Sequence, residues 1–336
     1  MSYNKKVSVL TPCYNGEKFI YRLLDSILIQ DYPHIEMYVI DDGSTDNSAQ
    51  VIQSYIPKFI DKGYTLSYLY QDNSGQSEAI NKGLKLITGD YFVWPDSDDF
   101  YIEKTAISQL VNVIENSDEQ TSTVRCHCEL LDEVNLNKVG EFATNQKNRY
   151  KEDLFEDCLF AQNGFWFVPG NYMAKVEVLR SLLPSLNIYT EKNAGQNWQL
   201  MLPLFYKKKC LTIPKNLYGV LVRSDSHSRG QYSTYEKTIE KYGAYERTII
   251  NTLDSMSLPE HELQSYKDTI QRKYKNVRLQ VMIDFKKRHD AKLAFKHLNE
   301  NNEFFSMKLK IKYYLMNIPW LYRSLKMLTL CMKHRV

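Results

Sequence analysis

The sequence predicts an α/β protein with a mixed, mostly parallel sheet flanked by helices and followed by a helical C-terminal extension. Two observations carry this prediction. Over residues 7–94, short runs rich in β-branched and aromatic residues alternate with segments whose apolar residues recur at helical spacing. Beyond residue 231 the apolar spacing is helical almost throughout. Strands that alternate with helices pair in parallel through right-handed crossovers, so the first part forms a layered sheet domain.

Each predicted element has a local cause. The first helix follows from apolar side chains three and four positions apart, such as Phe19, Leu23 and Ile27. The strands are short apolar runs bounded by glycine, proline, asparagine or aspartate. In order, the expected elements are strand Val7–Thr11, helix Glu17–Gln30, strand Ile35–Ile40, a helix capped by Ser44 or Asp46, strand Thr65–Tyr70, helix Glu78–Ile87 and strand Tyr91–Trp94.

The fourth predicted strand ends in a cluster of carboxylates. Pro95 stops the strand, and Asp96, Asp98 and Asp99 follow directly. Side chains alternate along an extended segment, so Asp96 and Asp98 point the same way. Two convergent carboxylates repel each other, and Mg²⁺ or Mn²⁺ with substrate phosphate oxygens would relieve that repulsion. The alternative is a turn that caps a helix starting near Tyr101.

Charge divides the chain into two parts. Residues 1–229 carry 23 Lys and Arg against 29 Asp and Glu, whereas residues 230–336 carry 20 against 11. With 336 residues, 43% of them hydrophobic, the chain can bury one sizeable core and an appendage. We therefore expect a catalytic domain over residues 1–229 and a basic helical extension over residues 230–336.

The six cysteines indicate reduced thiols in the cytoplasm. They show no Cys-x-x-Cys spacing, and no secretory leader precedes them. The triplet Cys126-His127-Cys128 alternates faces on an expected strand and lacks a second pair, so a zinc site is disfavoured.

The C-terminal residues combine basic and apolar side chains. No acidic residue follows Glu303, while lysines and arginines accompany apolar residues such as Met307, Ile311 and Tyr314. Such a segment can lie on an anionic membrane surface, or it can pack on the catalytic domain. No run approaches the roughly 20 apolar residues that span a bilayer. Nucleic acid is not an expected partner, because the basic residues form no recognisable binding motif.

Three segments in order carry a resemblance to a known family. They are VSVLTPCYNGEKFI from Val7, VIDDGSTDNS from Val39, and NSGQSEAINKGLKLITGDYFVWPDSDD from Asn73. Taken together at these intervals, they resemble an inverting family 2 glycosyltransferase with the GT-A fold, of the type that builds bacterial surface polysaccharides. The match is strong over residues 6–105 and weaker to about residue 229.

The resemblance implies a nucleotide-sugar site. Asp98 would ligate Mn²⁺ or Mg²⁺, and Asp96 would contact the ribose or support the metal. Thr11 and Asp42 match positions that hold the base, and Asp42 is suited to accept a hydrogen bond from the imide N–H of uracil, which favours a UDP-sugar. The remaining positions carried over are Pro12 and Tyr14 in the base pocket and Gln76, Ser77 and Asn81 beside the sugar.

The catalytic position departs from the family pattern. Where the family places a Glu-Asp pair, this chain has Gln196-Asn197, and an amide cannot accept the proton of an acceptor hydroxyl. Glu191 is the nearest replacement as base; Asp157 and Asp225 are other candidates. Gln196 and Asn197 are then expected to bind acceptor hydroxyls.

Two further segments are expected to complete the site. Residues 223–229 (RSDSHSR) resemble the family's flexible loop, in which His227 would add a metal ligand and Arg223 or Arg229 would neutralise the departing UDP. The aromatic residues around Trp166 would form a platform for the acceptor sugar, or they are core residues.

The expected function is therefore transfer of a sugar from a UDP-sugar to a glycan or lipid-linked oligosaccharide at the inner face of the cell membrane. Two other classes stay open. An inactive donor-binding subunit of a glycosyltransferase complex would share the nucleotide motifs and lack a base. A nucleotidyltransferase would share the metal chemistry, but it typically opens with a basic glycine-rich phosphate loop, and TPCYNGEKF is not one.

Overall fold

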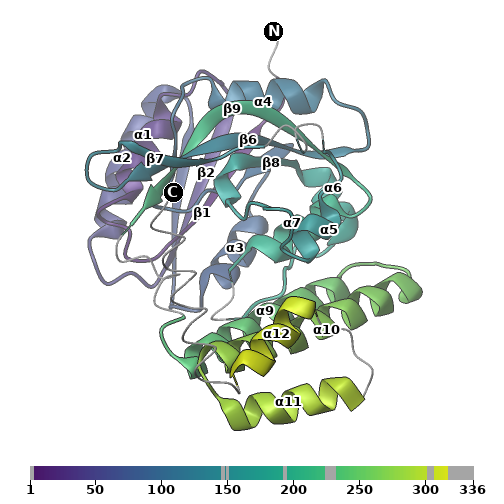
Figure 1. Ribbon diagram of the computed structural model, residues 1–336. Coiled ribbons are helices and arrows are strands. Elements are labelled where there is room, and N and C mark those ends of the chain that lie inside the picture. Colours follow the sequence, from purple (N-terminus) through teal and green to yellow (C-terminus); the bar gives the residue numbers. More distant parts are fainter. Residues whose placement is uncertain are drawn as a thin grey trace. The chain divides into compact units, whose positions relative to one another are not determined.

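The computed structural model describes residues 4–144, 148, 151–191, 195–223, 232–300 and 306–316. These described residues belong to two compact units (Figure 1). The first unit comprises Met1–Ser226 with Asn251–Leu258, and the second comprises His227–Ile250 with Pro259–Val336. The division at residue 229, inferred from charge, stays a prediction about domain organisation.

Within the described residues, the first unit contains a nine-stranded mixed sheet with the order β3-β2-β1-β4-β8-β6-β9-β5, and β7 pairs with β6. Strands β1 to β4 are parallel where they pair, and β8 then runs antiparallel to both β4 and β6. The strands are β1 (Val7–Cys13), β2 (Ile35–Asp42), β3 (Thr65–Gln71), β4 (Tyr91–Val93), β5 (Phe100–Tyr101), β6 (Thr121–Asp132), β7 (Lys138–Phe142), β8 (Tyr172–Lys175) and β9 (Lys209–Val222).

Helices cover both faces of this sheet (Figure 1). Side chains of a strand alternate between faces, so Val7 and Val9 join one core cluster while Leu10 faces α3. At Gly83 of α3, a Cβ would lie 2.0 Å from a Leu10 methyl carbon, so any larger residue there would force the buried Leu10 side chain to move. The helices are α1 (Ile20–Leu28), α2 (Ser48–Lys62), α3 (Gln76–Leu84), α4 (Ala106–Glu115), α5 (Phe155–Leu159), α6 (Val176–Leu182) and α7 (Asn197–Phe205), with the 3₁₀ turn η2 (Pro169–Asn171).

The four strands and the helices expected between them are confirmed, with shorter helices at α1 and α3. Asp46, rather than Ser44, contacts the start of α2, because its carboxylate accepts a hydrogen bond from the Ser48 amide at 3.0 Å. The helix expected near Tyr101 is wrong: Phe100–Tyr101 forms β5 against β9, and α4 begins only at Ala106. The capping alternative for the aspartate cluster is therefore also wrong.

The second unit consists of helices. They are α9 (Tyr235–Ser255), whose last residues belong to the first unit, α10 (Glu260–Asp284), α11 (Arg288–Glu300) and α12 (Met307–Met316). A small apolar core joins α10, α11 and α12 through residues such as Leu279, Leu298 and Leu309. Among the helices of the described ranges, none combines the length and the hydropathy that crossing a bilayer requires. The basic residues after Met316 lie outside the described residues.

Candidate active site

The carboxyl ends of β1, β2, β3 and β4 meet at one edge of the sheet, because these strands are parallel. Cys13 at the end of β1 lies opposite Asp41 of β2, and Asp42 lies opposite Gln71 of β3. The aspartate cluster follows β4 at this same edge. In open α/β sheets ligands bind at such an edge. Nearly all the residues that the sequence led us to expect around a nucleotide-sugar lie on or beside it.

Asp42 fixes the loop that leads from β3 to α3. Its Oδ1 accepts hydrogen bonds from Gln71 Nε2 at 2.7 Å and from the Ser74 amide at 2.8 Å. Its Oδ2 accepts one from the Gly75 amide at 2.9 Å. A carboxylate offers about four acceptor positions, so one position is left for a ligand. The side chain therefore both orders this loop and can receive one further donor.

The other residues expected around the base differ in exposure. Thr11 and Pro12 are buried, whereas Tyr14 is exposed beyond the end of β1. In the part of the chain that the structure describes, the Thr11 hydroxyl is buried without a hydrogen-bond partner. Buried hydroxyls are normally satisfied, so this one is a candidate for a ligand contact.

Two glutamines hold Asp96. Gln76 is the first residue of α3, and its Nε2 donates to Asp96 Oδ1 at 2.8 Å. Gln196 precedes α7, and its Nε2 donates to the same oxygen at 3.0 Å. Burial and the charge of Asp98 raise the pKa of Asp96 to about 7, against the lowering effect of the two amides. Negative charge in this turn is therefore costly unless a cation neutralises it.

Asp98 pairs with Arg223 at the end of β9. Arg223 donates from a guanidinium nitrogen to Asp98 Oδ2 at 2.9 Å, and its guanidinium carbon lies 4.3 Å from the centre of the Phe19 ring. The neighbouring Asp99 is buried and accepts a hydrogen bond from the Leu221 amide at 3.0 Å. Burial and then the charges of Asp98 and Asp96 raise the pKa of Asp99. Asp99 thus fixes the end of β9, two residues before Arg223.

Asp96 and Asp98 fit a divalent cation as a partial ligand set. Among the described residues, no group of three His, Cys, Asp or Glu side chains is arranged to hold a metal. Mg²⁺ and Mn²⁺ are commonly held by one or two carboxylates, with water and substrate phosphate oxygens completing the shell. The arrangement therefore suits a cation that arrives with a diphosphate rather than a cation caged by protein. Arg223 contacts only Oδ2 of Asp98, so the other carboxylate oxygen is not used by this ion pair.

Glu191 lies beside the donor residues of α3. Its backbone amide donates to Ser77 Oγ at 3.4 Å, and its carboxylate accepts a hydrogen bond from the Tyr189 hydroxyl at 3.2 Å. Asn81 fixes the same segment: it exchanges hydrogen bonds of 3.0 Å and 2.8 Å with the backbone of Ile188. The Asn81 side chain therefore holds the segment that carries Glu191. The sequence did not predict this role, because it placed Asn81 beside the sugar.

The two amides at the start of α7 each keep an unused acceptor. Within the described ranges, Gln196 Oε1 and Asn197 Oδ1 are buried without a hydrogen-bond partner. The next residue, Trp198, donates its indole N–H to the Cys158 carbonyl at 2.8 Å and packs on Phe167. Gln196 thus donates a hydrogen bond to Asp96 through Nε2, while its Oε1 can accept one from a ligand hydroxyl.

Two other expected residues, Asp157 and Trp166, lie away from this cluster. His227, Asp225 and Arg229 lie outside the described residues. Asp157 is buried in an ion pair with Lys151 and accepts a hydrogen bond from Asn163 Nδ2 at 2.7 Å. Trp166 is a core residue rather than an exposed platform, because its ring is buried against Arg125 and His127.

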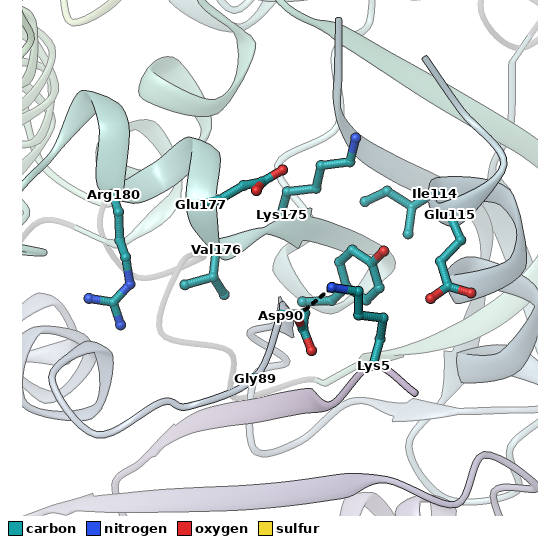
Figure 2. Close-up of a pocket in the computed structure, with 10 residues that line it drawn as sticks. Lys5, Gly89, Asp90, Ile114, Glu115, Lys175, Val176, Glu177 and Arg180 are labelled. Atoms are coloured by element: carbon teal, nitrogen blue, oxygen red, sulfur yellow. Dashed lines mark hydrogen bonds and ion pairs between the residues drawn. The ribbon is translucent and has the colours of Figure 1, made fainter. Parts of the chain in front are cut away.

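A separate cavity of about 560 Å³ is lined by Lys5, Asp90 and Lys175 among other residues (Figure 2). It lies at the end of the sheet opposite to the aspartate cluster, where β1 and β4 begin. Tyr91 begins β4 there, and Lys175 ends β8 beside it. Charges of both signs line this cavity, and Lys5 pairs with Asp90 at 2.9 Å. The cavity shares no residue with the aspartate cluster, so it is not the donor site.

The fold and the residues at this edge agree with the GT-A fold expected from the sequence. Residues 8–181 match the sequence model described as Glycosyl transferase family 2. The chain belongs to that family. The pattern expected from the sequence is thereby confirmed at the level of family, fold and enzyme class.

Two curated relatives and one solved structure illustrate the likeness. An uncharacterized glycosyltransferase of Rickettsia typhi is 31% identical over 159 residues, covering 47% of this chain and 46% of that protein. The putative teichuronic acid biosynthesis glycosyltransferase TuaG of Bacillus subtilis is 39% identical over 111 residues, covering 33% and 43%. The chain therefore spans about half the length of the curated relatives it matches.

The solved structure is S. aureus TarS 1–349 in complex with UDP-GlcNAc. It superimposes with a TM-score of 0.59 at 19% identity, over 84% of this chain and 80% of that one. At this identity the likeness concerns the fold.

Proposed function

We propose that this protein transfers a sugar from a UDP-sugar, with Mn²⁺ or Mg²⁺, to a glycan or lipid-linked oligosaccharide, with inversion at the anomeric carbon. The observation that carries the proposal is the pair Asp96 and Asp98 at the carboxyl edge of the parallel strands. Asp96 is held by two amides and Asp98 by an arginine that can be exchanged. A divalent cation held by this pair would neutralise charge on the departing diphosphate.

Uracil is the base that the strand ends favour. Asp42 retains one acceptor position, which suits the imide N–H of uracil, and the Thr11 hydroxyl is unpaired among the described residues. The UDP-GlcNAc complex of TarS, which has the same fold, supports a UDP-sugar as donor. Tyr14 and Pro12 would flank the base, and Gln76 and Ser77 would border the sugar.

Glu191 is the proposed general base. In the transfer, the acceptor oxygen bonds to the anomeric carbon as the bond from that carbon to the phosphate oxygen breaks. The acceptor's proton would go to the Glu191 carboxylate, and Arg223 would neutralise the diphosphate of the departing UDP. The unused oxygens of Gln196 and Asn197 would orient acceptor hydroxyls. His227 remains a proposed further metal ligand from the sequence alone.

The acceptor class and location rest on family context. The name of TuaG refers to teichuronic acid biosynthesis, which supports an acceptor in cell-surface polysaccharide assembly. We place the reaction in the cytoplasm at the inner face of the cell membrane, where a lipid-linked acceptor would be presented. A nucleic acid is not among the proposed partners.

One alternative has a specific observation in its favour. Because the family's acidic pair is replaced by Gln196 and Asn197, the chain could serve as a donor-binding subunit without turnover of its own. Both functions require donor binding, and only the first requires a base.

The nucleotide can be tested by thermal unfolding with 1 mM UDP or GDP, each in Mn²⁺ and in EDTA. We expect UDP with Mn²⁺ to raise the melting temperature by several degrees, because a ligand at about 100 times its Kd adds about 2.7 kcal/mol of stability. GDP should give a clearly smaller shift, since Asp42 fits the uracil imide. An equal shift with GDP would contradict the assignment of the base.

A further inference from the structure

Helix α12 has apolar residues on two faces. Leu309, Tyr313 and Met316 are buried, whereas Met307, Ile311 and Tyr314 are 70%, 51% and 58% exposed. Both sets follow a spacing of four and then three residues, so each forms its own stripe along the helix. We call Met307, Ile311 and Tyr314 the outer stripe.

The inner stripe fixes the orientation of the helix. Leu309, Tyr313 and Met316 belong to one cluster with Leu279 and Leu298 of α10 and α11. The Tyr313 ring stacks on Phe295 with centroids 3.9 Å apart and an angle of 2° between the rings. The packing of α12 rests mainly on the inner stripe, and of the outer stripe Tyr314 meets the Phe295 ring edge-on with centroids 5.7 Å apart. All three outer side chains nevertheless stay more than half exposed.

Basic residues lie next to the outer stripe along α12. Lys308, Lys310 and Lys312 alternate with its apolar residues, and α11, which packs on α12 through Phe295, carries Lys292 and Lys296. Some of these lysines have acidic neighbours: Lys312 lies 3.7 Å from Asp284, and Lys296 lies 3.6 Å from Glu300. Residues 288–300 and 306–316 nevertheless carry six Lys and Arg against two Asp and Glu. The surface is positive as well as apolar.

We infer that the outer stripe of α12 inserts into the headgroup region of an anionic lipid bilayer, with the neighbouring lysines of α12 contacting lipid phosphates. Charge complementarity selects this occupant. An apolar face flanked by lysines matches an acyl boundary beneath negative headgroups, and a tyrosine at the rim suits the interface. This inference rests on the proposed location and deepens it, because it names the residues that make the contact.

The test is co-sedimentation of the full chain with vesicles of pure phosphatidylcholine, or of phosphatidylcholine with 30% phosphatidylglycerol. We expect binding only to the anionic vesicles, weakening as salt is raised. Ile311→Glu should weaken it by at least about tenfold, since an inserted apolar side chain is replaced by a charge that the anionic surface repels. Each of Lys308→Gln and Lys310→Gln should weaken it about fivefold.

Ile60→Glu is the matched control. Ile60 is 65% exposed near the end of α2 in the first unit, so the same change should leave vesicle binding unaltered. UDP binding, measured on each variant, reports the donor site separately, and a loss of vesicle binding with normal UDP binding supports the inference. Absence of binding to anionic vesicles would overturn it, as would equal effects of Ile311→Glu and Ile60→Glu. A concentration-dependent dimer that Ile311→Glu disrupts, with vesicle binding unchanged, would assign the stripe to a second copy instead.

Discussion

Replacing Asp98 with alanine is expected to abolish the contribution of metal to donor binding. In the wild type, EDTA should weaken UDP affinity by roughly a hundredfold, because a cation on the diphosphate supplies several kcal/mol. In Asp98→Ala, the affinity in Mn²⁺ should fall to the value measured in EDTA. Isothermal titration calorimetry with UDP under both conditions measures this directly.

The pairing of Asp98 with Arg223 sharpens this prediction. Without Asp98, one negative charge beside the expected diphosphate position is removed, and the guanidinium loses its 2.9 Å contact to that carboxylate. UDP affinity in EDTA should therefore be equal to or higher than that of the wild type in EDTA. A matched control is Asp61→Ala, which removes an exposed carboxylate at the end of α2 and should change neither affinity. Unchanged UDP affinity of Asp98→Ala in Mn²⁺ would exclude Asp98 as the metal ligand.

Replacing Glu191 with glutamine is expected to lower turnover by about a thousandfold while leaving donor affinity within about twofold, since general-base catalysis typically contributes 10²–10⁴. Glutamine is nearly isosteric, and its carbonyl oxygen can still accept the hydrogen bond from the Tyr189 hydroxyl. The Ser77 contact uses the backbone amide of residue 191 and is also retained. The loss should therefore appear in kcat and not in Kd.

The readout for this variant is UDP release with saturating donor, compared with Glu115→Gln, an exposed glutamate at the end of α4. We expect the control to turn over at the wild-type rate. Glu191→Gln turning over at that same rate would exclude Glu191 as the base and return attention to Asp225, which lies outside the described residues. If the wild type binds UDP tightly but forms no UDP from any UDP-sugar, the inactive-subunit alternative is favoured.

The strand ends could be predicted from the sequence because their signals are local. Alternating apolar residues and the breaks at Pro95 and Gly43 place Asp42 and Asp96 at one edge of a parallel sheet. The prediction of a helix near Tyr101 was wrong because these residues form β5, which pairs with β9 over a hundred positions away. Tertiary pairing of this kind overrides local preference.

The contacts that finish the site are also distant in sequence. Arg223 reaches Asp98 across 125 positions, and Asn81 reaches Ile188 across 107. A single sequence carries no signal for such pairs, since any exposed arginine or helical asparagine would look the same. The sequence places Asp99 in one carboxylate cluster with Asp96 and Asp98. Its hydrogen bond from the Leu221 amide, which holds β9, appears only in the folded chain.

The most direct test of the account is donor cleavage by the full chain with a panel of UDP-sugars, measured as UDP released in Mn²⁺ and then in EDTA. We expect UDP release from one donor in Mn²⁺ and no UDP release in EDTA, because Asp96 and Asp98 would act through a cation on the diphosphate. Release at the same rate in EDTA would contradict the metal site that the two aspartates are proposed to form.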